Sequence, residues 1–322
     1  MEDKILLLAN PNGNSWEFAK KIYDKLNSNP EREVRYRLGE VEIKNFNDKE
    51  IFIKILSNAR EKTVFFIHDS TMNPQDWTIS LAEVNDALMR SSVGKVTNVL
   101  PYMKYSRQDR ITDPRVPLTS SVLAKIICMD ADRVITTDLH NPAITGSYDI
   151  PFDNLKAYPV IINYLKEKYP EFLENVVVVA PDVGCAERAK SYAKRLNCDV
   201  AIATKSREKA GVVGEMKIIG DVEGKNVIVV DDMIDTAGTL CKAAEVLKEK
   251  GALRIWACAT HGILSIDAVD KINNSVFEKV IMTDSIPRAS FGKIEIVTLT
   301  DLFAETIHRI CHKGSVSELF RI

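Results

Sequence analysis

The sequence lacks the patterns that mark several common kinds of site. Its six cysteines are scattered and form no Cys-x-x-Cys pair, which predicts reduced thiols rather than a zinc site or a disulfide framework. It contains neither GxxxxGKS/T nor GxGxxG, and this excludes a Walker A loop and a dinucleotide fingerprint. No Ser/His/Asp or Cys/His arrangement indicates a protein nucleophile.

A large excess of charge of one sign and long apolar runs are missing too. The 322 residues include 43 Lys and Arg against 45 Asp and Glu, which leaves a net charge of -2. No global field therefore favours nucleic acid or an anionic membrane, and local groups must hold any anionic ligand. The N-terminal stretch MEDKILLLAN is too short for a signal peptide or a membrane span. We expect a cytoplasmic protein with neither a nucleic-acid nor a membrane partner.

What is present indicates an α/β protein. The apolar fraction of 45% and the charged fraction of 27% are typical of a globular chain, and the length suits two domains. Apolar strand patterns alternate with helix patterns, and polar loops follow the strands, which predicts mostly parallel sheets. Ligands of such sheets bind at the carboxyl ends of the strands. Two sheets fit the length, with a boundary near residue 155.

The apolar periodicity places the expected elements. Strands are expected at residues 5–9, 34–43, 64–67, 96–100, 134–137, 176–180, 200–203, 226–230 and 254–259. Helices are expected at residues 15–26, 77–90, 118–129, 157–167, 186–196 and 240–250, with Ser15 as a candidate N-cap of the first.

Residues 226–251, NVIVVDDMIDTAGTLCKAAEVLKEKG, are the most informative stretch. A strand pattern leads to Asp231 and Asp232, a short turn of small residues follows, and a helix pattern then ends at Gly251. The apolar face of that helix consists of Leu240, Ala243, Ala244 and Leu247.

This order of residues suits a sugar phosphate. Backbone N–H groups at a helix start have no intrahelical partner and lie at the positive end of the dipole, so the turn suits a phosphate. Ala237 and Gly238 let an anion approach the backbone, while Thr236 and Thr239 add hydroxyl donors. The neighbouring acidic pair repels phosphate and should face sugar hydroxyls or a metal. The alternative is an acidic turn on an ordinary α/β sheet.

Two cationic stretches are candidates for neutralising phosphate charge. Arg107-Gln108-Asp109-Arg110 follows an expected strand, where a guanidinium can bind phosphate oxygens bidentately. Lys205 and Arg207 begin a charged stretch long enough to close over a transferring group. Solvated ion-pair loops would show the same residues, and the two interpretations stay open.

Two further side chains lie at expected strand ends. His140 follows Asp138, and a neutral imidazole there can bind a metal or a phosphate oxygen, or serve only the structure. Asp182, in Pro-Asp-Val-Gly, suits Mg²⁺, which takes only one or two carboxylates together with substrate phosphates.

The chain resembles the ribose-phosphate diphosphokinase (phosphoribosyl-diphosphate synthetase) family over most of its length. Residues 226–251 resemble the phosphoribosyl-diphosphate binding motif, an apolar strand followed by two acidic residues and Asp-Thr-small-Gly-Thr. The other matching stretches are residues 45–50, 105–110, 137–140, 148–155, 180–184, 260–265, 272–275, 283–287 and 314–320. The chain departs from the family pattern at Lys49, residues 111–114, Asn141-Pro142 and Ile266-Asp267.

The resemblance implies an α/β fold of two tandem type I phosphoribosyltransferase-like domains with mostly parallel sheets. The domains would span residues 1–155 and 156–322, with the extreme C-terminal strands exchanged between them. Dimers would assemble into a ring-like hexamer. The implied reaction converts Mg²⁺-ATP and ribose 5-phosphate into 5-phosphoribosyl diphosphate and AMP, which makes Mg²⁺ the expected cofactor.

By position, the resemblance also implies substrate contacts. Asp231 and Asp232 would hold the ribose hydroxyls. The 5-phosphate would lie in the turn of Asp235, Thr236, Ala237, Gly238 and Thr239. Contacts to ATP are implied for Arg107, Gln108, Asp109 and His140, and for Phe46, Asp48 and Glu50, which would reach the adenine pocket of a neighbouring subunit.

The remaining implied roles concern metal, catalysis and regulation. His140 and Asp182 would bind metal ions, and Lys205 and Arg207 would stabilise the transition state. Ser315 and Ser317 match a loop that binds phosphate or ADP in the allosterically regulated members.

Two other functions share parts of this pattern. A phosphoribosyltransferase needs the acidic sugar-phosphate motif but neither the loop at residues 107–110 nor a second domain. A non-catalytic, synthetase-associated regulatory subunit is the other alternative, and members of that kind carry an insertion in the flexible loop. Here a compact stretch to Gly220 follows Arg207, so we expect an active enzyme.

Overall fold

The computed structural model describes residues 4–28, 35–205 and 216–320. The chain divides into two compact units. Unit 1 comprises Met1–Lys156, Ser285–Pro287 and Leu299–Arg321, and unit 2 comprises Ala157–Asp284 and Arg288–Thr298. All six cysteines are free thiols. No helix of the described segments is both long and apolar enough to cross a membrane.

Unit 1 is built on a seven-stranded sheet with the order β3-β2-β1-β4-β5-β6-β7. Neighbouring strands are parallel except β2 and β3, which form an antiparallel hairpin. The strands are β1 (Ile5–Ala9), β2 (Tyr36–Asn45), β3 (Ile51–Ile55), β4 (Thr63–Ile67), β5 (Lys95–Leu100), β6 (Arg133–Thr137) and β7 (Phe152–Leu155). The helices are α1 (Trp16–Asn27), α2 (Pro74–Arg90), α3 (Thr119–Cys128), η1 (Pro142–Ser147), α8 (Thr300–Cys311) and η4 (Ser317–Phe320).

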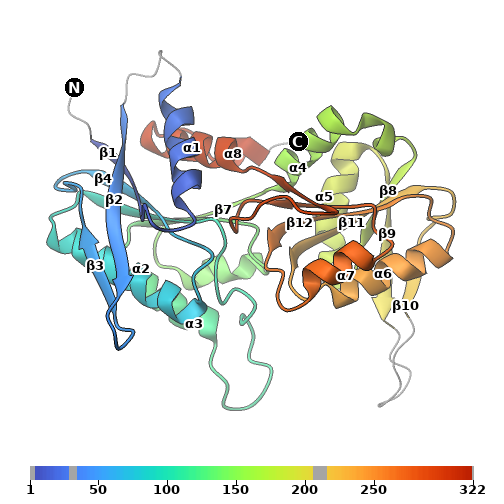
Figure 1. Ribbon diagram of the computed structural model, residues 1–322, viewed down its shortest axis with the longest axis horizontal. Coiled ribbons are helices and arrows are strands. Elements are labelled where there is room, and N and C mark those ends of the chain that lie inside the picture. The colour runs from blue at the N-terminus through green and yellow to red at the C-terminus, as the bar shows by residue number, and fades with distance from the viewer. Residues whose placement is uncertain (1–3, 29–34, 206–215, 321–322) are drawn as a thin grey trace. The chain divides into compact units, whose positions relative to one another are not determined.

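Helices cover both faces of the unit 1 sheet (Figure 1). α2 and α3 lie on one face, where Trp77 joins a buried cluster with Phe66. α1 and α8 lie on the other face, where Phe18 meets Phe303 edge to face at a centroid distance of 5.5 Å. Because successive strand side chains point to opposite faces, a strand covered on both sides must be apolar throughout. This explains the uninterrupted apolar run Ile5–Ala9, which is buried at every position.

The helix α8 belongs to unit 1 although unit 2 precedes it along the chain. Lys25 of α1 pairs with Asp301 at 2.9 Å. The hydroxyl of Tyr36 and Nδ1 of His308 are 3.0 Å apart. We expected extreme C-terminal strands to be exchanged between the domains, whereas the long C-terminal element that groups with unit 1 is a helix.

Unit 2 contains a second seven-stranded sheet, with the order β10-β9-β8-β11-β12-β13-β14. Only β9 and β10 pair antiparallel. The strands are β8 (Val176–Ala180), β9 (Asp199–Lys205), β10 (Met216–Ile219), β11 (Asn226–Ile234), β12 (Ile255–Gly262), β13 (Lys279–Thr283) and β14 (Ile294–Val297). The helices are α4 (Tyr158–Lys168), η2 (Pro170–Leu173), η3 (Val183–Cys185), α5 (Ala186–Leu196), α6 (Gly238–Glu249) and α7 (Ala268–Asn274).

The two sheets have the same topology. In each sheet the first strand of the unit lies third from one edge. The second and third strands of the unit lie on that side of it, and the fourth to seventh strands follow in order on the other side. α6 and α7 cover one face of the unit 2 sheet, and α4 and α5 cover the other (Figure 1). The sequence prediction of an α/β fold with two mostly parallel sheets is confirmed.

Local predictions fare differently at particular positions. The predicted strand Val176–Ala180 and the predicted helix Ala186–Leu196 have the bounds seen in the structure. Gly251 takes a φ of 86° just beyond α6, as expected of a helix-ending glycine. Ser15 occupies the predicted N-cap position of α1, but its hydroxyl donates to the carbonyl oxygen of Ile67 at 3.5 Å and makes no capping hydrogen bond.

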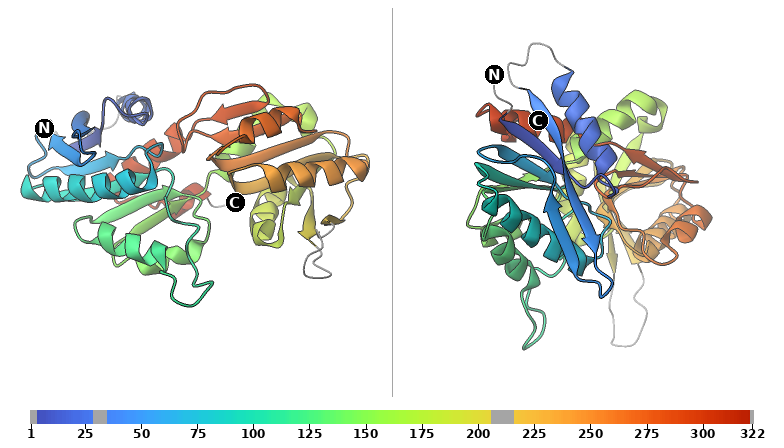
Figure 2. Two further views of the ribbon diagram at one scale, coloured as in Figure 1. Left: turned by 60° about the horizontal axis from the view of Figure 1, so that its bottom comes forward. Right: turned by 60° about the vertical axis from the view of Figure 1, so that its left-hand side comes forward.

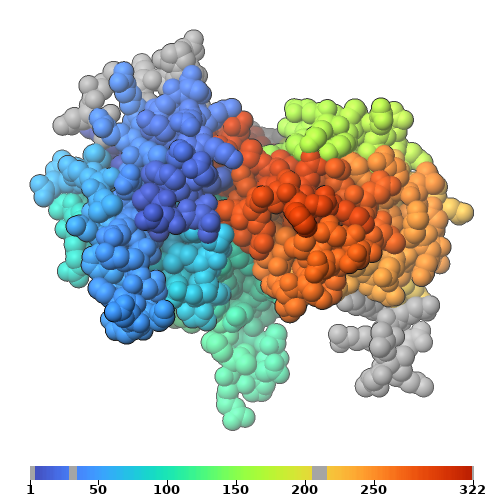
Figure 3. Space-filling model, viewed as in Figure 1, coloured from blue at the N-terminus to red at the C-terminus, as the bar shows by residue number. Residues whose placement is uncertain are grey.

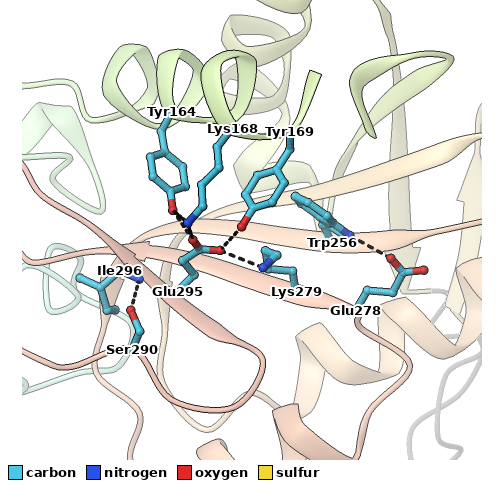
Figure 4. Close-up of polar contacts among 9 residues, drawn as sticks. All are labelled: Tyr164, Lys168, Tyr169, Trp256, Glu278, Lys279, Ser290, Glu295 and Ile296. Carbon is cyan, nitrogen blue, oxygen red and sulfur yellow. Dashed lines mark hydrogen bonds and ion pairs between the residues drawn. The ribbon is translucent and has the colours of Figure 1, made fainter. Parts of the chain in front are cut away.

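Glu295 fastens α4 and the segment after it to the β13–β14 edge of the unit 2 sheet (Figure 4). One carboxylate oxygen accepts hydrogen bonds from Tyr164 and Lys168, and the other accepts from Tyr169 at 2.7 Å and Lys279 at 2.9 Å. Burial alone would raise the pKa of Glu295, but these donors, led by Lys168, lower it to about 2. The stabilisation by the ionised Glu295 and its donors is therefore fully present above the ordinary pKa of 4.5 and is lost as the pH falls through about 2.

We expect Glu295→Gln to loosen α4, because an amide lacks the charge that attracts two ammonium groups. A hydrogen bond to a charged group contributes about 1.5–3 kcal/mol. Solvent screens this partly exposed cluster, so we expect a loss of about 1 kcal/mol at about pH 7. Hydrogen–deuterium exchange of the α4 amides should then accelerate about fivefold.

The matched control is Glu245→Gln, which removes an exposed pair with Lys242 on α6. This control should leave exchange in α4 unchanged. Equal protection of α4 in the two variants would contradict the role given to Glu295.

Candidate active site

The winding of unit 2 reverses between β8 and β11. From β8 the chain continues to β9 and β10 on one side, and it then returns to place β11 on the other side of β8. In such sheets, ligands bind at the carboxyl ends of the two strands that flank the reversal. These two ends carry residues 181–185 and 231–239, which hold most of the predicted acceptor residues.

The acidic pair lies inside β11 and not after it. We expected the strand to end at Val230, but β11 continues to Ile234 because its pairing with β12 extends further than its pairing with β8. Oδ1 of Asp231 accepts the backbone amide of Asp232 at 2.8 Å and the thiol of Cys185 at 3.2 Å. Strand pairing therefore holds the pair in place.

The surroundings of these acids are crowded with negative charge. Burial, followed by the hydrogen bond and charge of Asp232, raises the pKa of Asp231 to about 7. Burial and the charge of Asp231 also raise the pKa of the Cys185 thiol. One ligand atom from each of the three side chains lies within 4.8 Å of the others. Such a place favours a ligand that donates hydroxyl hydrogens or carries positive charge.

The turn after β11 is open to solvent at the start of α6. Ala237 takes a φ of 59°, a conformation that is uncommon outside glycine. A Cβ built on Gly238 would meet no atom within 4 Å. The side chains of Thr236 and Thr239 are exposed. Because the first amides of a helix lack intrahelical acceptors, this open turn can receive a phosphate.

The loop after β12 supports the turn. The amides of Ile263 and Leu264 donate to the carbonyl oxygen of Ile234 at 2.9 and 3.0 Å. The amide of Ser265 donates to the carbonyl oxygen of Asp235 at 3.0 Å. Both acceptors immediately precede the open part of the turn, so the loop sets the direction in which the chain enters it.

Asp182 lies after β8, as the sequence predicts, and its side chain is exposed. It accepts the amide of Cys185 at 3.2 Å and so begins η3. Sequence analysis did not predict Cys185 as a site residue, because an isolated cysteine has no ligand spacing. Its position directly after Gly184, in the turn that follows a buried strand, was the available signal.

The cationic loop of unit 1 joins β5 to α3 and projects from the surface of that unit, where it is coloured teal-green in Figure 3. Arg107, Gln108 and Arg110 are exposed. The backbone carbonyl of Gln108 accepts the amide of Ser120 at 3.1 Å, and its side-chain oxygen accepts the hydroxyl of Thr119 at 2.6 Å. Gln108 is therefore fixed to the first turn of α3.

Asp109 links this loop to the turn after β6. Its carboxylate accepts the side-chain amide of Asn141 at 2.6 Å, and Asn141 in turn accepts the backbone amide of Ala143 at 3.0 Å. His140, the preceding residue, is exposed. Asp109, a predicted site residue, therefore contacts Asn141, which directly follows the predicted site residue His140.

Phe46, Asp48 and Glu50 lie in the turn of the β2–β3 hairpin, coloured blue in the right-hand view of Figure 2. The amide of Phe46 donates to the carbonyl oxygen of Glu50 at 2.8 Å, and the amide of Glu50 donates to Asp48 at 3.1 Å. Phe46 is 51% exposed. β1 and β4 separate this hairpin from β5, so it belongs to another part of the sheet than the loop of Arg107.

The other predicted residues lie elsewhere in the two units. Lys205 is the last residue of β9, and Arg207 lies outside the described residues. The hydroxyls of Ser315 and Ser317 are 3.0 Å apart, and Arg309 of α8 donates to the carbonyl oxygen of Ser315 at 2.7 Å.

Unit 1 has a corresponding reversal of winding between β1 and β4, but there the chain's own groups bind one another. By strand register, His68 and Asp69 take the positions of Asp231 and Asp232. Asp69 accepts the backbone amide of Asn14 at 2.7 Å across this reversal. The two units therefore share a topology but differ in the chemistry at the same place.

Two repeated seven-stranded sheets, with an acidic pair and an open small-residue turn in the second, define a two-domain α/β protein of the type I phosphoribosyltransferase fold. A family model described as the N-terminal domain of ribose phosphate pyrophosphokinase matches residues 9–129. Another, described as a phosphoribosyl synthetase-associated domain, matches residues 204–321.

Whole-chain comparisons agree with the fold. A curated ribose-phosphate pyrophosphokinase from Xanthomonas campestris pv. campestris is 44% identical over 296 residues, covering 90% of this chain and 92% of its own. One from Chlorobaculum tepidum is 46% identical over 302 residues, covering 91% and 93%. The crystal structure of phosphoribosylpyrophosphate synthetase from Mycobacterium smegmatis matches with a TM-score of 0.85 and 29% identity, covering 97% of this chain and 100% of that one. The chain belongs to the ribose-phosphate pyrophosphokinase family of enzymes.

The raised pKa of Asp231 makes this residue a stability cost at high pH. The folded state favours the protonated form of Asp231. The contribution of this proton to the free energy of unfolding is therefore fully present below the ordinary pKa of 3.8 and is lost as the pH rises through about 7. We expect Asp231→Asn to stabilise the chelator-treated protein by on the order of 2 kcal/mol at about pH 8, and by less at about pH 5. Urea unfolding at the two pH values measures the difference.

The control for this prediction is Asp221→Asn. Asp221 is exposed, and its hydrogen bond to Lys225 lowers its pKa, so the substitution should bring no gain at either pH. An Asp231→Asn variant no more stable than the parent at the higher pH would contradict the prediction.

Proposed function

We propose that the chain is a ribose-phosphate diphosphokinase, which transfers the β,γ-diphosphoryl group of ATP to the C1 hydroxyl of ribose 5-phosphate. The products are 5-phosphoribosyl diphosphate and AMP, and the first of these supplies nucleotide biosynthesis. The observation that carries the proposal is the acidic pair of β11 followed by the open turn at the start of α6. It occurs in a chain 44% and 46% identical to curated ribose-phosphate pyrophosphokinases.

Ribose 5-phosphate binds at the winding reversal of unit 2. Asp231 and Asp232 accept hydrogen bonds from the ribose hydroxyls, and Asp235, Thr236, Ala237, Gly238 and Thr239 bind the 5-phosphate. The acidic pair repels the phosphate while the helix start attracts it, so charge alone orients the sugar. Because strand pairing holds the acids, the C1 hydroxyl is presented in a fixed direction.

ATP is bound by Arg107, Gln108, Asp109 and His140. A guanidinium can bind two phosphate oxygens at once, and Arg107 is exposed on its loop. Gln108 and Asp109 are held by α3 and by Asn141, which keeps the base of the loop in place.

A neighbouring subunit completes the adenine pocket with Phe46, Asp48 and Glu50. The exposed Phe46 ring offers a surface for stacking a base. The working enzyme is therefore a homo-oligomer of dimers, for which we propose a hexamer. Residues 1–155 would serve ATP and subunit contacts, and residues 156–322 would serve ribose 5-phosphate and the catalytic loop.

Mg²⁺ is the proposed cofactor, and a metal-ion requirement is consistent with the family. His140, an exposed imidazole after β6, is the proposed ligand of the metal ion that ATP carries, and Asp182, an exposed carboxylate after β8, is the proposed ligand of a second Mg²⁺. These few donors fit a cation that takes one or two carboxylates together with substrate phosphates. When bound, Mg²⁺ neutralises charge on the phosphates.

In the transfer step, the C1 hydroxyl oxygen forms a bond to the β-phosphorus of ATP and its proton passes to solvent. The bond between the β-phosphorus and the oxygen of the α-phosphate breaks, and AMP leaves with that electron pair. Lys205 and Arg207 stabilise the charge that develops, which agrees with a sequence that has no nucleophile pattern. Ser315 and Ser317 are a candidate allosteric site for phosphate or ADP. We also propose that the enzyme acts in the cytoplasm.

Incubation with ATP, ribose 5-phosphate and Mg²⁺ tests the proposal. We expect AMP to form in stoichiometric amount with 5-phosphoribosyl diphosphate. ADP, or no nucleotide product, would exclude a diphosphokinase, and only the absence of any product would favour the associated regulatory subunit. Consumption of added 5-phosphoribosyl diphosphate with a nucleobase would favour a phosphoribosyltransferase.

We expect Lys205→Ala to lower kcat by roughly 100- to 1000-fold, the usual cost of losing one preorganised transition-state donor. Binding of ribose 5-phosphate, measured by calorimetry, should change little because the acidic pair and the turn are intact. Lys190→Ala is the matched control, since Lys190 is an exposed lysine paired with Glu187 on α5. Unchanged turnover in Lys205→Ala would remove this residue from the mechanism.

A further inference from the structure

The loop at residues 262–267 has a conformation that its own residues disfavour. Leu264 and Ile266 take φ values of 53° and 57°, in the region that favours glycine. Ile266 is 91% exposed, so packing of its side chain does little to offset the strain. At Gly262 a Cβ would lie 2.8 Å from the sulfur of Met282, so a side chain there would displace the end of this methionine. A backbone of this kind persists only where surrounding contacts hold it.

Arg288 supplies such contacts. Its Nε donates to the carbonyl oxygen of Gly262 at 2.9 Å, and its Nη2 donates to that of Ile263. A planar guanidinium can hold two neighbouring acceptors in a fixed relation, whereas an ammonium group is a single point of charge. Arg288 thus clamps the two residues at which the loop leaves β12.

The clamp reaches the turn after β11 through rigid peptide planes. The carbonyl of Gly262 and the amide of Ile263 share one plane, and the carbonyl of Ile263 and the amide of Leu264 share the next. Both amides donate to the carbonyl oxygen of Ile234. A side chain that orients the two carbonyls therefore also orients the two amides that hold the start of the turn.

We propose that Arg288 is a positioning residue for ribose 5-phosphate, acting through residues 262–265 on the turn that receives the 5-phosphate. The identity of the ligand rests on the proposed function, whereas the clamp itself rests on the contacts of unit 2 alone. Arg288 orients the amides of Ile263 and Leu264, which hold the start of the phosphate-binding turn, and it does not touch the reacting atoms. Its loss should therefore weaken binding of ribose 5-phosphate and leave the transfer step largely intact.

Steady-state kinetics of Arg288→Gln test the effect on function. We expect the KM for ribose 5-phosphate to rise about tenfold, while kcat and the KM for ATP stay within about twofold. Arg288→Lys keeps the charge but not the planar pair of donors, so most of the rise should remain. Arg254→Gln, which removes a guanidinium that pairs with Glu278 on the same unit, is the control and should leave all three constants unchanged.

Hydrogen–deuterium exchange without substrates tests the clamp independently. In Arg288→Gln the amides of residues 263–265 should exchange faster than in the parent, with α5 unchanged. Adding Ile266→Gly, which lets that position take its φ without strain, should lower the KM for ribose 5-phosphate again in the double variant.

Three results would overturn the positioning role. They are an unchanged KM for ribose 5-phosphate in Arg288→Gln, a fall confined to kcat, or full recovery in Arg288→Lys, which would show that charge alone acts. Absence of AMP formation in the parent protein would refute the proposed function instead, and the exchange measurement would still decide whether Arg288 holds the loop.

Discussion

Both units depend on one constraint: strands paired in parallel end at the same edge of the sheet, so the chain must cross a face of the sheet before each new strand. Where the winding reverses, two neighbouring strand ends are left with connections that diverge. In unit 2 this constraint brings the thiol of Cys185 to the carboxylate of Asp231, although the two residues belong to different strand ends. In unit 1 the same place is filled by Asp69 and the amide of Asn14. Topology determines where a site can form, and side chains decide whether it does.

The elements that could be predicted from the sequence are those with strong local patterns. Val176–Ala180 is apolar throughout because both faces are covered, and α6 shows a regular apolar face. The strands β3, β7, β10, β13 and β14 were not predicted, and neither were the helices α7 and α8. Several of these strands are short, and partners far away in the sequence decide their pairing. The same reason extends β11 past Val230, since its continuation depends on β12.

The candidate site divides in a similar way. The acidic pair and the turn that follows were predicted, because their chemistry depends on spacing within one stretch of chain. Cys185 and Arg288 were missed, because the role of each depends on a contact with a residue far away in the sequence. Asn141 was noted only as a departure from a family pattern, yet it joins Asp109 to the turn after β6. A sequence pattern indicates which groups a ligand needs, whereas the fold decides what holds them.

The place of α8 in the chain has a consequence for synthesis. A ribosome delivers this helix only after all of unit 2 has been made, although the helix packs on α1 near the N-terminus. Until then the emerging unit 1 has no Phe303 to cover Phe18 and no Asp301 to pair with Lys25. Domains generally fold as units once their residues are available. The half of the protein that is translated first is therefore the half that is completed last.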